Sequence, residues 1–217
     1  MAERRGDDAE DRRGRTGDGV KAHAGAERRR RTILAAARAM LRREPLSMRR
    51  LAAEAGVSQA TPYNLFGSKR RLALALHLEL EAELMAQVRA SGAADALDRM
   101  YTAIRLTAEA IEAEAPLYRA LFAIIYTSDA EGEEVRSAAA FWDALIPPLH
   151  AEGLIEAGAD VPAFTRNFVY LLSGALIEWA DRRIDTPALL RAVRYGFTLA
   201  ALGLATETSR ARLRAAL

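Results

Sequence analysis

Residues 47 to 72 constrain the fold of this chain more than any other stretch, because they predict two short helices joined by a tight turn. Ser47 and Ser58 stand where these helices begin, and a serine oxygen there accepts from unpaired first-turn N–H groups. Gly56 suits the left-handed conformation that ends a helix. The sequence therefore predicts a helix-turn-helix whose second helix, at 59 to 66, fits a DNA major groove.

The second helix carries residue types that contact DNA. Hydroxyl and amide side chains hydrogen-bond base edges, whereas other polar and cationic groups hold the sugar-phosphate backbone. We expect Gln59, Thr61 and Asn64 to face bases. Tyr63 and Lys69 are expected to serve the backbone. The full set of candidate DNA-binding residues is Ser47, Arg49, Ser58, Gln59, Ala60, Thr61, Tyr63, Asn64 and Lys69.

The same stretch resembles the N-terminal domain of TetR-type transcriptional repressors. That domain is usually written as a hydrophobic residue, A-x-x-A-G-V-S, a variable run, Y-x-x-F and x-S-K. The chain departs from the pattern at Pro62, where an aliphatic residue is usual, and at Leu65, where many members have a histidine. Pro62 falls in the first turn of its helix, where a missing N–H costs least. The matching residues are Leu51, Ala52, Ala55, Gly56, Val57, Ser58, Tyr63, Phe66, Ser68 and Lys69.

The resemblance implies an all-α fold in two domains. A three-helix DNA-binding domain is expected at residues 27–72, and a helical ligand-binding and dimerisation domain at 73–217. It also implies a homodimer that binds double-stranded DNA at a palindromic operator, and a repressor that a small, largely apolar ligand releases. Two alternatives stay open: an effector-independent helical DNA-binding protein, and a helical enzyme whose basic head is incidental.

Charge is distributed unevenly along the chain. Residues 1–72 contain 18 Lys or Arg and 9 Asp or Glu, a net charge of +9, whereas residues 73–217 contain 13 and 20, a net charge of −7. A basic segment joined to an acidic remainder is typical of a polyanion-binding module. Residues 1–26 are charged and Gly-rich, which predicts a disordered basic arm that either follows DNA or is a solvated tail. The first helix is expected from Glu27 to Arg43, with the arginines at 28–31 near phosphate in its first turn.

The sequence contains no constellation typical of catalysis or metal binding. There is no cysteine, and His23, His77 and His150 are far apart without ligand spacing. No phosphate loop, dinucleotide fingerprint or nucleophile elbow is present. We therefore predict no enzyme activity, no metal and no cofactor. The sequence has no run of 18 apolar residues that could span a membrane, so a cytoplasmic location is expected.

Apolar residues at helical spacing continue to the C-terminus. A helix from Lys69 to about Ala90 is expected to link the two domains mechanically. Pro147 and Pro148 mark either a kink or a helix end. Thr186 is expected to cap the last helix. The apolar stripes predict further helices over residues 97–111, 117–125, 135–146, 164–179 and 187–204.

Most aromatic residues lie in this second half, which favours an apolar ligand pocket between helices. Glu178 is the strongest candidate for its polar handle, because Leu176, Ile177 and Trp179 flank it. The candidate ligand-binding residues are Tyr101, Arg105, Phe122, Tyr126, Trp142, His150 and Glu178.

Small residues in the last two long helices point to close helix packing. Gly196, Ala200 and Gly203 fall on one face of the last helix, and Ser173 and Gly174 lie in the helix before it. Such residues let helices approach closely, and two helices from each subunit make a four-helix bundle. The alternative is that this face packs within one subunit.

Overall fold

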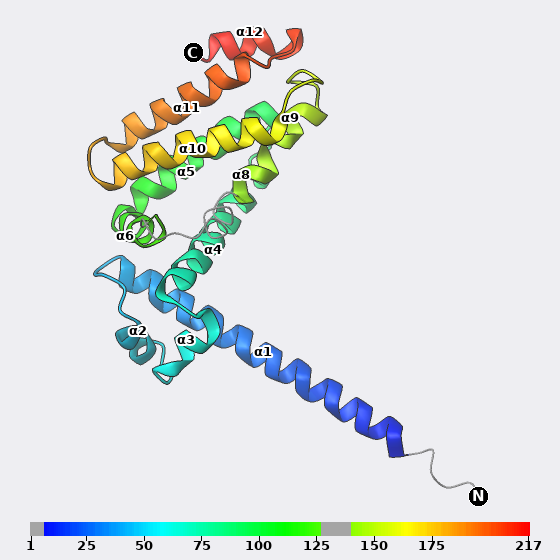
Figure 1. Cartoon of the computed structure of the whole chain (residues 1–217), viewed down its shortest axis with the longest axis vertical. Helices are drawn as coiled ribbons and strands as arrows, with labels where there is room; N and C mark the ends of the chain where they lie inside the picture. Colours follow the sequence, from blue (N-terminus) through cyan, green and yellow to red (C-terminus); the bar gives the residue numbers. More distant parts are fainter. Residues whose placement is uncertain (1–6, 127–139) are drawn as a thin grey trace, which may run out of the picture.

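The computed structural model describes residues 7–126 and 140–217, with side chains from Ala24 onward. These residues form helices and no β-strand, which confirms the predicted all-α class (Figure 1). The helices are α1 Asp7–Leu41, α2 Met48–Glu54, α3 Ala60–Phe66, α4 Lys69–Ala90, α5 Ala96–Ala113, α6 Ala115–Ile125, α8 Ala140–Leu145, α9 Pro147–Ala151, α10 Val161–Ala180, α11 Thr186–Leu202 and α12 Glu207–Ala215. We call α1 to α3 the head and α5 to α12 the sensor. No helix in the described ranges is both long and apolar enough to cross a membrane.

Helix α1 begins at Asp7 rather than near Glu27, and so runs through residues 7–26 of the predicted disordered arm (Figure 1). No proline precedes Pro45, and alanine, arginine and glutamate are good helix formers, so the helix continues through the segment although its glycines are unfavourable in a helix. The arm's first six residues lie outside the described part. The arginines at 28–31 lie well inside α1, so the expected placement in a first turn is wrong.

The head packs on one face of α1, and its buried residues belong to a hydrophobic core that continues into the sensor. Ile33 of α1, Leu51 of α2 and Leu72 of α4 are fully buried in it. Gly56, at φ 66°, makes the left-handed turn after α2. The guanidinium of Arg30 lies 4.6 Å from the ring centroid of Phe66 and covers the end of α3. The predicted helix-turn-helix is therefore present, with α2 and α3 held against α1.

Helix α4 connects the head to the sensor. Its 22 residues span about 33 Å at 1.5 Å per residue. The Ser68 hydroxyl caps it by accepting from the N–H of Arg71 at 3.0 Å. The helix contacts α1 and α3 of the head, and α5, α6 and α8 of the sensor. One rigid element thus touches both domains, as the sequence predicted.

The sensor is a bundle in which α10 and α11 lie side by side, with α5 against α11 (Figure 1). Trp179 and Phe197 are fully buried between these helices. Pro147 begins a separate helix, α9, so the proline pair marks a helix end. Helix α12, which packs on α11, was not predicted. Residues 135–139 of the expected helix at 135–146 lie outside the described part.

Two expected caps differ from those observed in the sensor and head. Asp185, not Thr186, caps α11, because its carboxylate accepts from the N–H of Ala188 at 2.8 Å. The Thr186 hydroxyl instead accepts from the indole N–H of Trp179 at 2.9 Å. Ser47 stands at the N-cap position of α2, but its side chain makes no capping bond.

Candidate DNA-binding surface and ligand cavity

Helix α3 presents one polar side to solvent. Gln59, Tyr63 and Asn64 are exposed, and Tyr63 keeps 52% of its surface accessible. Pro62 and Phe66 are buried on the opposite side. Pro62 therefore occupies the core position where the TetR pattern has an aliphatic residue, and its departure from the pattern does not alter the exposed side.

The start of α3 differs from the expectation that Ser58 caps it. Gln59 is the N-cap residue, and no side-chain capping bond is made there. The Ser58 hydroxyl lies 2.8 Å from the Thr61 hydroxyl, so the two hydroxyls share a hydrogen bond. Thr61 is also half-buried, whereas Ala60 is exposed. Gln59 and Asn64 are consequently the residues best placed to reach base edges.

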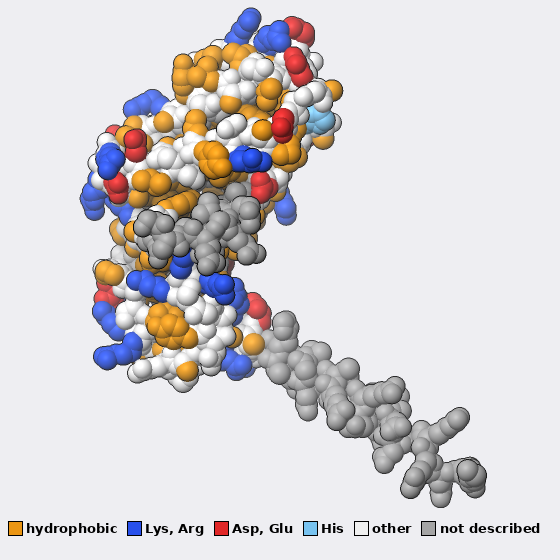
Figure 2. Space-filling view, in the orientation of Figure 1, with side chains coloured by type: hydrophobic (Ala, Val, Ile, Leu, Met, Phe, Trp, Pro, Cys, Tyr) orange, Lys and Arg blue, Asp and Glu red, His pale blue; other side chains and the backbone are white. Residues whose placement is uncertain are grey.

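Two basic groups near α3 stay available for phosphate. Arg49 on α2 and Lys69 at the start of α4 are both exposed, and no carboxylate in the described ranges pairs with them. Neighbouring arginines are neutralised, since Arg43 pairs with Glu54 at 3.2 Å and Arg50 pairs with Glu44. Figure 2 shows Lys and Arg side chains around the head. The surface thus combines hydrogen-bonding groups on α3 with cations beside it.

The α3 geometry predicts two classes of variants. Gln59→Ala or Asn64→Ala should reduce discrimination at particular base pairs by about 1–3 kcal/mol, because each removes one of the expected base contacts. Lys69→Ala should weaken binding to all sequences alike, because phosphates carry no sequence information. Selection of binding sites from a random library, done with each variant, checks this difference. Identical sequence preferences in both classes would contradict it.

A cavity of about 40 Å³ lies between the sensor and α4, with walls from α4, α5, α6, α8 and α10. Its lining is mainly apolar and includes Leu80 and Leu84 of α4. Four aromatic side chains take part, from α6 and α8: Tyr118, Phe122, Phe141 and Trp142. Small-molecule sites are typically concave and apolar with a few polar groups, and this cavity has that composition.

The polar groups of the cavity are a buried pair on α4. His77 Nε2 lies 3.2 Å from Glu81 Oε1, one helical turn apart, and the two residues are 8% and 9% exposed. The other ring nitrogen, His77 Nδ1, is buried and has no hydrogen-bond partner among the described residues. The same holds for the hydroxyl of Thr107, which lines the same cavity from α5. Buried polar atoms normally have partners, so two orphaned atoms in one cavity point to a ligand or water that bonds them.

Only part of the predicted ligand-binding set reaches this cavity. Phe122 and Trp142 line it. The ring centroid of Tyr126 lies 5.8 Å from that of Phe122, so Tyr126 packs behind the wall. The Tyr101 hydroxyl bonds the Thr198 hydroxyl at 2.9 Å, which joins α5 to α11 away from the cavity.

Three polar candidates lie elsewhere on the surface. Arg105 is exposed and pairs with Glu109 at 2.7 Å. His150 is exposed near the end of α9, with Nε2 3.3 Å from the carbonyl oxygen of Ala157. Glu178 is exposed on α10 and does not line the cavity, because it lies about 200° around the helix from the buried Leu176. The polar side chains on α4 that line this cavity are His77 and Glu81, and Glu178 is not among its lining residues.

An ion-pair cluster ties the head to the sensor near the cavity. Glu114, at the junction of α5 and α6, accepts from Arg42 Nε at 2.7 Å and from Arg38 Nη2 at 2.8 Å. Arg38 also pairs with Glu83 of α4 at 3.0 Å. Hydrogen bonds from Arg42 and then Arg38 lower the pKa of Glu114 to about 2, against burial, which acts in the opposite direction. The cluster links α1, α4 and the start of α6.

This lowered pKa predicts a pH-dependent contribution to stability. The Glu114 carboxylate stabilises the folded state fully above its ordinary pKa of 4.5, and the contribution is lost as pH falls toward 2. Glu114→Gln should cost about 1 kcal/mol of unfolding free energy at neutral pH and progressively less in acid. Urea unfolding at pH 7 and about pH 3 measures this. Glu109→Gln, in an exposed pair on α5, is the control, and an equal loss for Glu114→Gln at both pH values would contradict the assignment.

Comparison with known proteins supports the assignment of the head. Residues 33–76 match the family model of bacterial regulatory proteins of the tetR family. No curated protein matches the chain. The predicted resemblance is confirmed over these residues, and regulators of this family are DNA-binding proteins without catalytic activity, in agreement with the predicted absence of enzyme function. No group of three or more metal-ligating side chains occurs in the described part.

Several solved structures share the fold. A TetR transcriptional regulator from Rhodococcus sp. RHA1 is 22% identical, with 80% of this chain and 96% of that chain covered and a TM-score of 0.66. FadR of Thermus thermophilus, a TetR-family transcriptional repressor in complex with lauroyl-CoA, is 21% identical, with 82% and 96% covered and a TM-score of 0.65. The fatty acid degradation regulator FadR from Bacillus halodurans is 19% identical, with 81% and 96% covered and a TM-score of 0.59. The chain therefore has the two-part helical fold of these regulators.

Proposed function

We propose that this chain is a TetR-type transcriptional regulator, which binds a palindromic operator as a homodimer and represses until a small, largely apolar ligand enters the sensor cavity. The head supplies DNA contacts through α3 and Arg49, and Lys69 at the start of α4 adds to them. The cavity supplies the ligand site. The Thermus thermophilus FadR, similar in fold, was solved with lauroyl-CoA, which supports a ligand-binding role for the sensor.

A single feature carries this proposal: α4 belongs to both sites. Its first residue, Lys69, lies at the DNA-binding surface, and two turns later His77 is in the cavity wall, followed by Glu81 and Leu84. A ligand that displaces this wall moves the helix that positions the head. Arg70 strengthens the connection, because its guanidinium donates to the carbonyl oxygen of Ile125 at the end of α6.

The small volume of the cavity couples ligand binding to a change of conformation. At about 40 Å³ it holds a few water molecules, whereas a dry cavity that binds benzene measures about 150 Å³. A ligand therefore binds only a conformer in which the walls have separated. Such a ligand shifts the population toward that conformer, because it binds the closed conformer less well.

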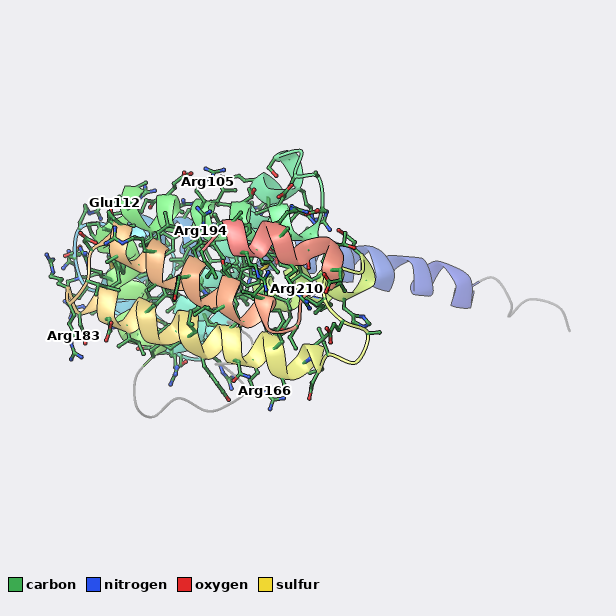
Figure 3. The ribbon with its side chains drawn as sticks, turned by 90° about the horizontal axis from the view of Figure 1, so that it is seen from above. Arg105, Glu112, Arg166, Arg183, Arg194 and Arg210 are labelled. Atoms are coloured by element: carbon green, nitrogen blue, oxygen red, sulfur yellow. The ribbon has the colours of Figure 1, made fainter. Side chains whose placement is uncertain are left out.

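The dimer is proposed to form through the outer faces of α10 and α11. Large apolar side chains are exposed there: Tyr170, Leu171, Ile177, Tyr195 and Leu199. Arg166 and Arg183 flank α10 near its two ends (Figure 3). An apolar centre with a charged rim is typical of a protein interface. A Cβ at Gly174 would meet nothing within this subunit, which fits close approach by a partner helix. Packing within the subunit explains the glycine at 196, because a Cβ added there would collide with the side chain of Leu171.

Effector release is the experiment that tests the proposed function. A matching ligand at about a hundred times its dissociation constant should stabilise the fold by roughly 2.7 kcal/mol and lower operator affinity, because the coupling is reciprocal. Val169→Phe, which fills the cavity from α10, should keep operator binding and lose the response. Glu178→Gln is the control on the same helix. Operator release across a chemically diverse ligand panel measures both. A Val169→Phe protein that still responds would place the ligand at a different site, whereas a wild-type protein that responds to no compound would support the effector-independent alternative.

A further inference from the structure

The described lining of the cavity has an unbalanced charge composition. Glu81 is its one acidic residue, and neither lysine nor arginine contributes to it in the ranges described. The nearest basic group is the imidazole of His77, which already contacts Glu81 Oε1. Burial, with the carboxylates of Glu114, Glu83 and Glu81 adding to it and the guanidinium of Arg38 opposing it, raises the pKa of Tyr118 to about 12, so this wall residue stays neutral. The described lining can therefore offer negative charge and contributes no lysine or arginine to pair with an anion.

We propose that the effector is a lipophilic amine: an apolar, ring-bearing body with one protonated nitrogen that pairs with Glu81. This rests on the proposed function and names the ligand class of the same site. Glu81 has two oxygens with about four acceptor positions, and the described contacts include one with His77 Nε2. An ammonium group fits the remaining positions, and the Thr107 hydroxyl and His77 Nδ1 accept its other N–H groups.

The aromatic walls favour the same class. Tyr118, Phe122 and Trp142 present π-systems to the cavity. A cation over such rings gains electrostatic attraction, and more of it where water is excluded. A buried charge without a partner is strongly unfavourable, so an ammonium that neutralises Glu81 is accepted where a carboxylate is rejected.

A matched series of three small probes tests whether the cavity prefers a cationic, a neutral or an anionic ligand. Benzylamine, benzyl alcohol and benzoate share one ring and differ in a head group that is cationic, neutral or anionic at pH 7. Titration calorimetry on the full-length protein without DNA measures their affinities directly. Benzylamine should bind at least about tenfold more tightly than benzoate, with benzyl alcohol between them.

Two isosteric variants on α4 locate the effect. Glu81→Gln removes the charge and keeps the shape, so the preference for benzylamine over benzoate should disappear. Glu79→Gln lies on the exposed side of the same helix and should leave the order unchanged. Because both variants lose one negative charge, a general electrostatic effect of the whole protein would act equally on the two.

The outcomes distinguish this inference from the proposed function. Failure of all three probes to bind, benzoate binding as tightly as benzylamine, or an unchanged preference in Glu81→Gln would each overturn the amine assignment. Benzylamine binding in the expected order without any operator release would support the ligand class and count against the proposed regulatory response. An operator-release assay with the same three compounds, run in parallel, therefore tests the regulatory response separately from the ligand class.

Discussion

The affinity of the dimer for its operator is expected to fall by about 10⁴-fold when salt rises from about 50 to 200 mM. Each subunit brings a basic head, with a net charge of +9 over residues 1–72, to a polyanion. If a dimer neutralises on the order of eight phosphates, released counterions give a log–log slope of roughly −7. Fluorescence anisotropy on a labelled operator, across a salt series, measures that slope.

A matched pair of variants tests where the slope originates. Lys69→Ala should make it less steep by about two for the dimer, because each subunit loses one phosphate contact. Arg105→Ala removes a cation from the middle of α5 in the sensor, outside the proposed DNA-binding surface, and should leave the slope unchanged. A binding constant that is indifferent to salt would contradict the proposed DNA-binding surface. Equal slopes for the wild-type protein and Lys69→Ala would remove Lys69 from it.

The head was predictable because its signals are local. A glycine at φ 66° after α2, a buried Leu51 and a serine cap before α4 each leave a mark at one place in the sequence. The observed bounds of α2, α3 and α4 lie within a residue or two of those predicted. The cap of α3 was missed because the Ser58 hydroxyl has two local partners to choose from, a backbone N–H and the Thr61 hydroxyl.

The cavity was only half predictable because it depends on long-range packing. Phe122 and Trp142 were found from aromatic content alone. His77 and Glu81 were missed because the leucines of α4 already account for one buried face, and a polar residue beside that face is usually solvated. Their four-residue spacing was visible, but the burial of a second face follows from α5, α6 and α8 surrounding α4. Glu178 was predicted as the polar group of the pocket because its neighbours in sequence are apolar. Those neighbours lie on other sides of α10, so they do not bury Glu178.

Replacing one leucine on the outer face of α11 should separate the dimer. Leu199 is 45% exposed and lies on the apolar surface that α10 and α11 share. In a two-fold interface the same surface meets itself, so Leu199→Glu places two carboxylates in one apolar contact. Burying them without partners is strongly unfavourable, and the expected product is a folded monomer. Light scattering after size-exclusion chromatography measures the mass, and circular dichroism checks that the helices remain.

The loss of the dimer should carry over to DNA. A monomer contacts one half-site, and the second contact of the dimer acts at a high effective concentration, so operator affinity should fall by about 10²–10⁴-fold. Ala86→Glu adds the same charge to an exposed position on α4 and should change neither mass nor affinity. At high concentration the Leu199→Glu monomer should still protect a single half-site in footprinting, because α3 and its cations are untouched. A dimeric Leu199→Glu protein would exclude the outer face of α10 and α11 as the interface, whereas a monomer with full operator affinity would contradict two-fold recognition.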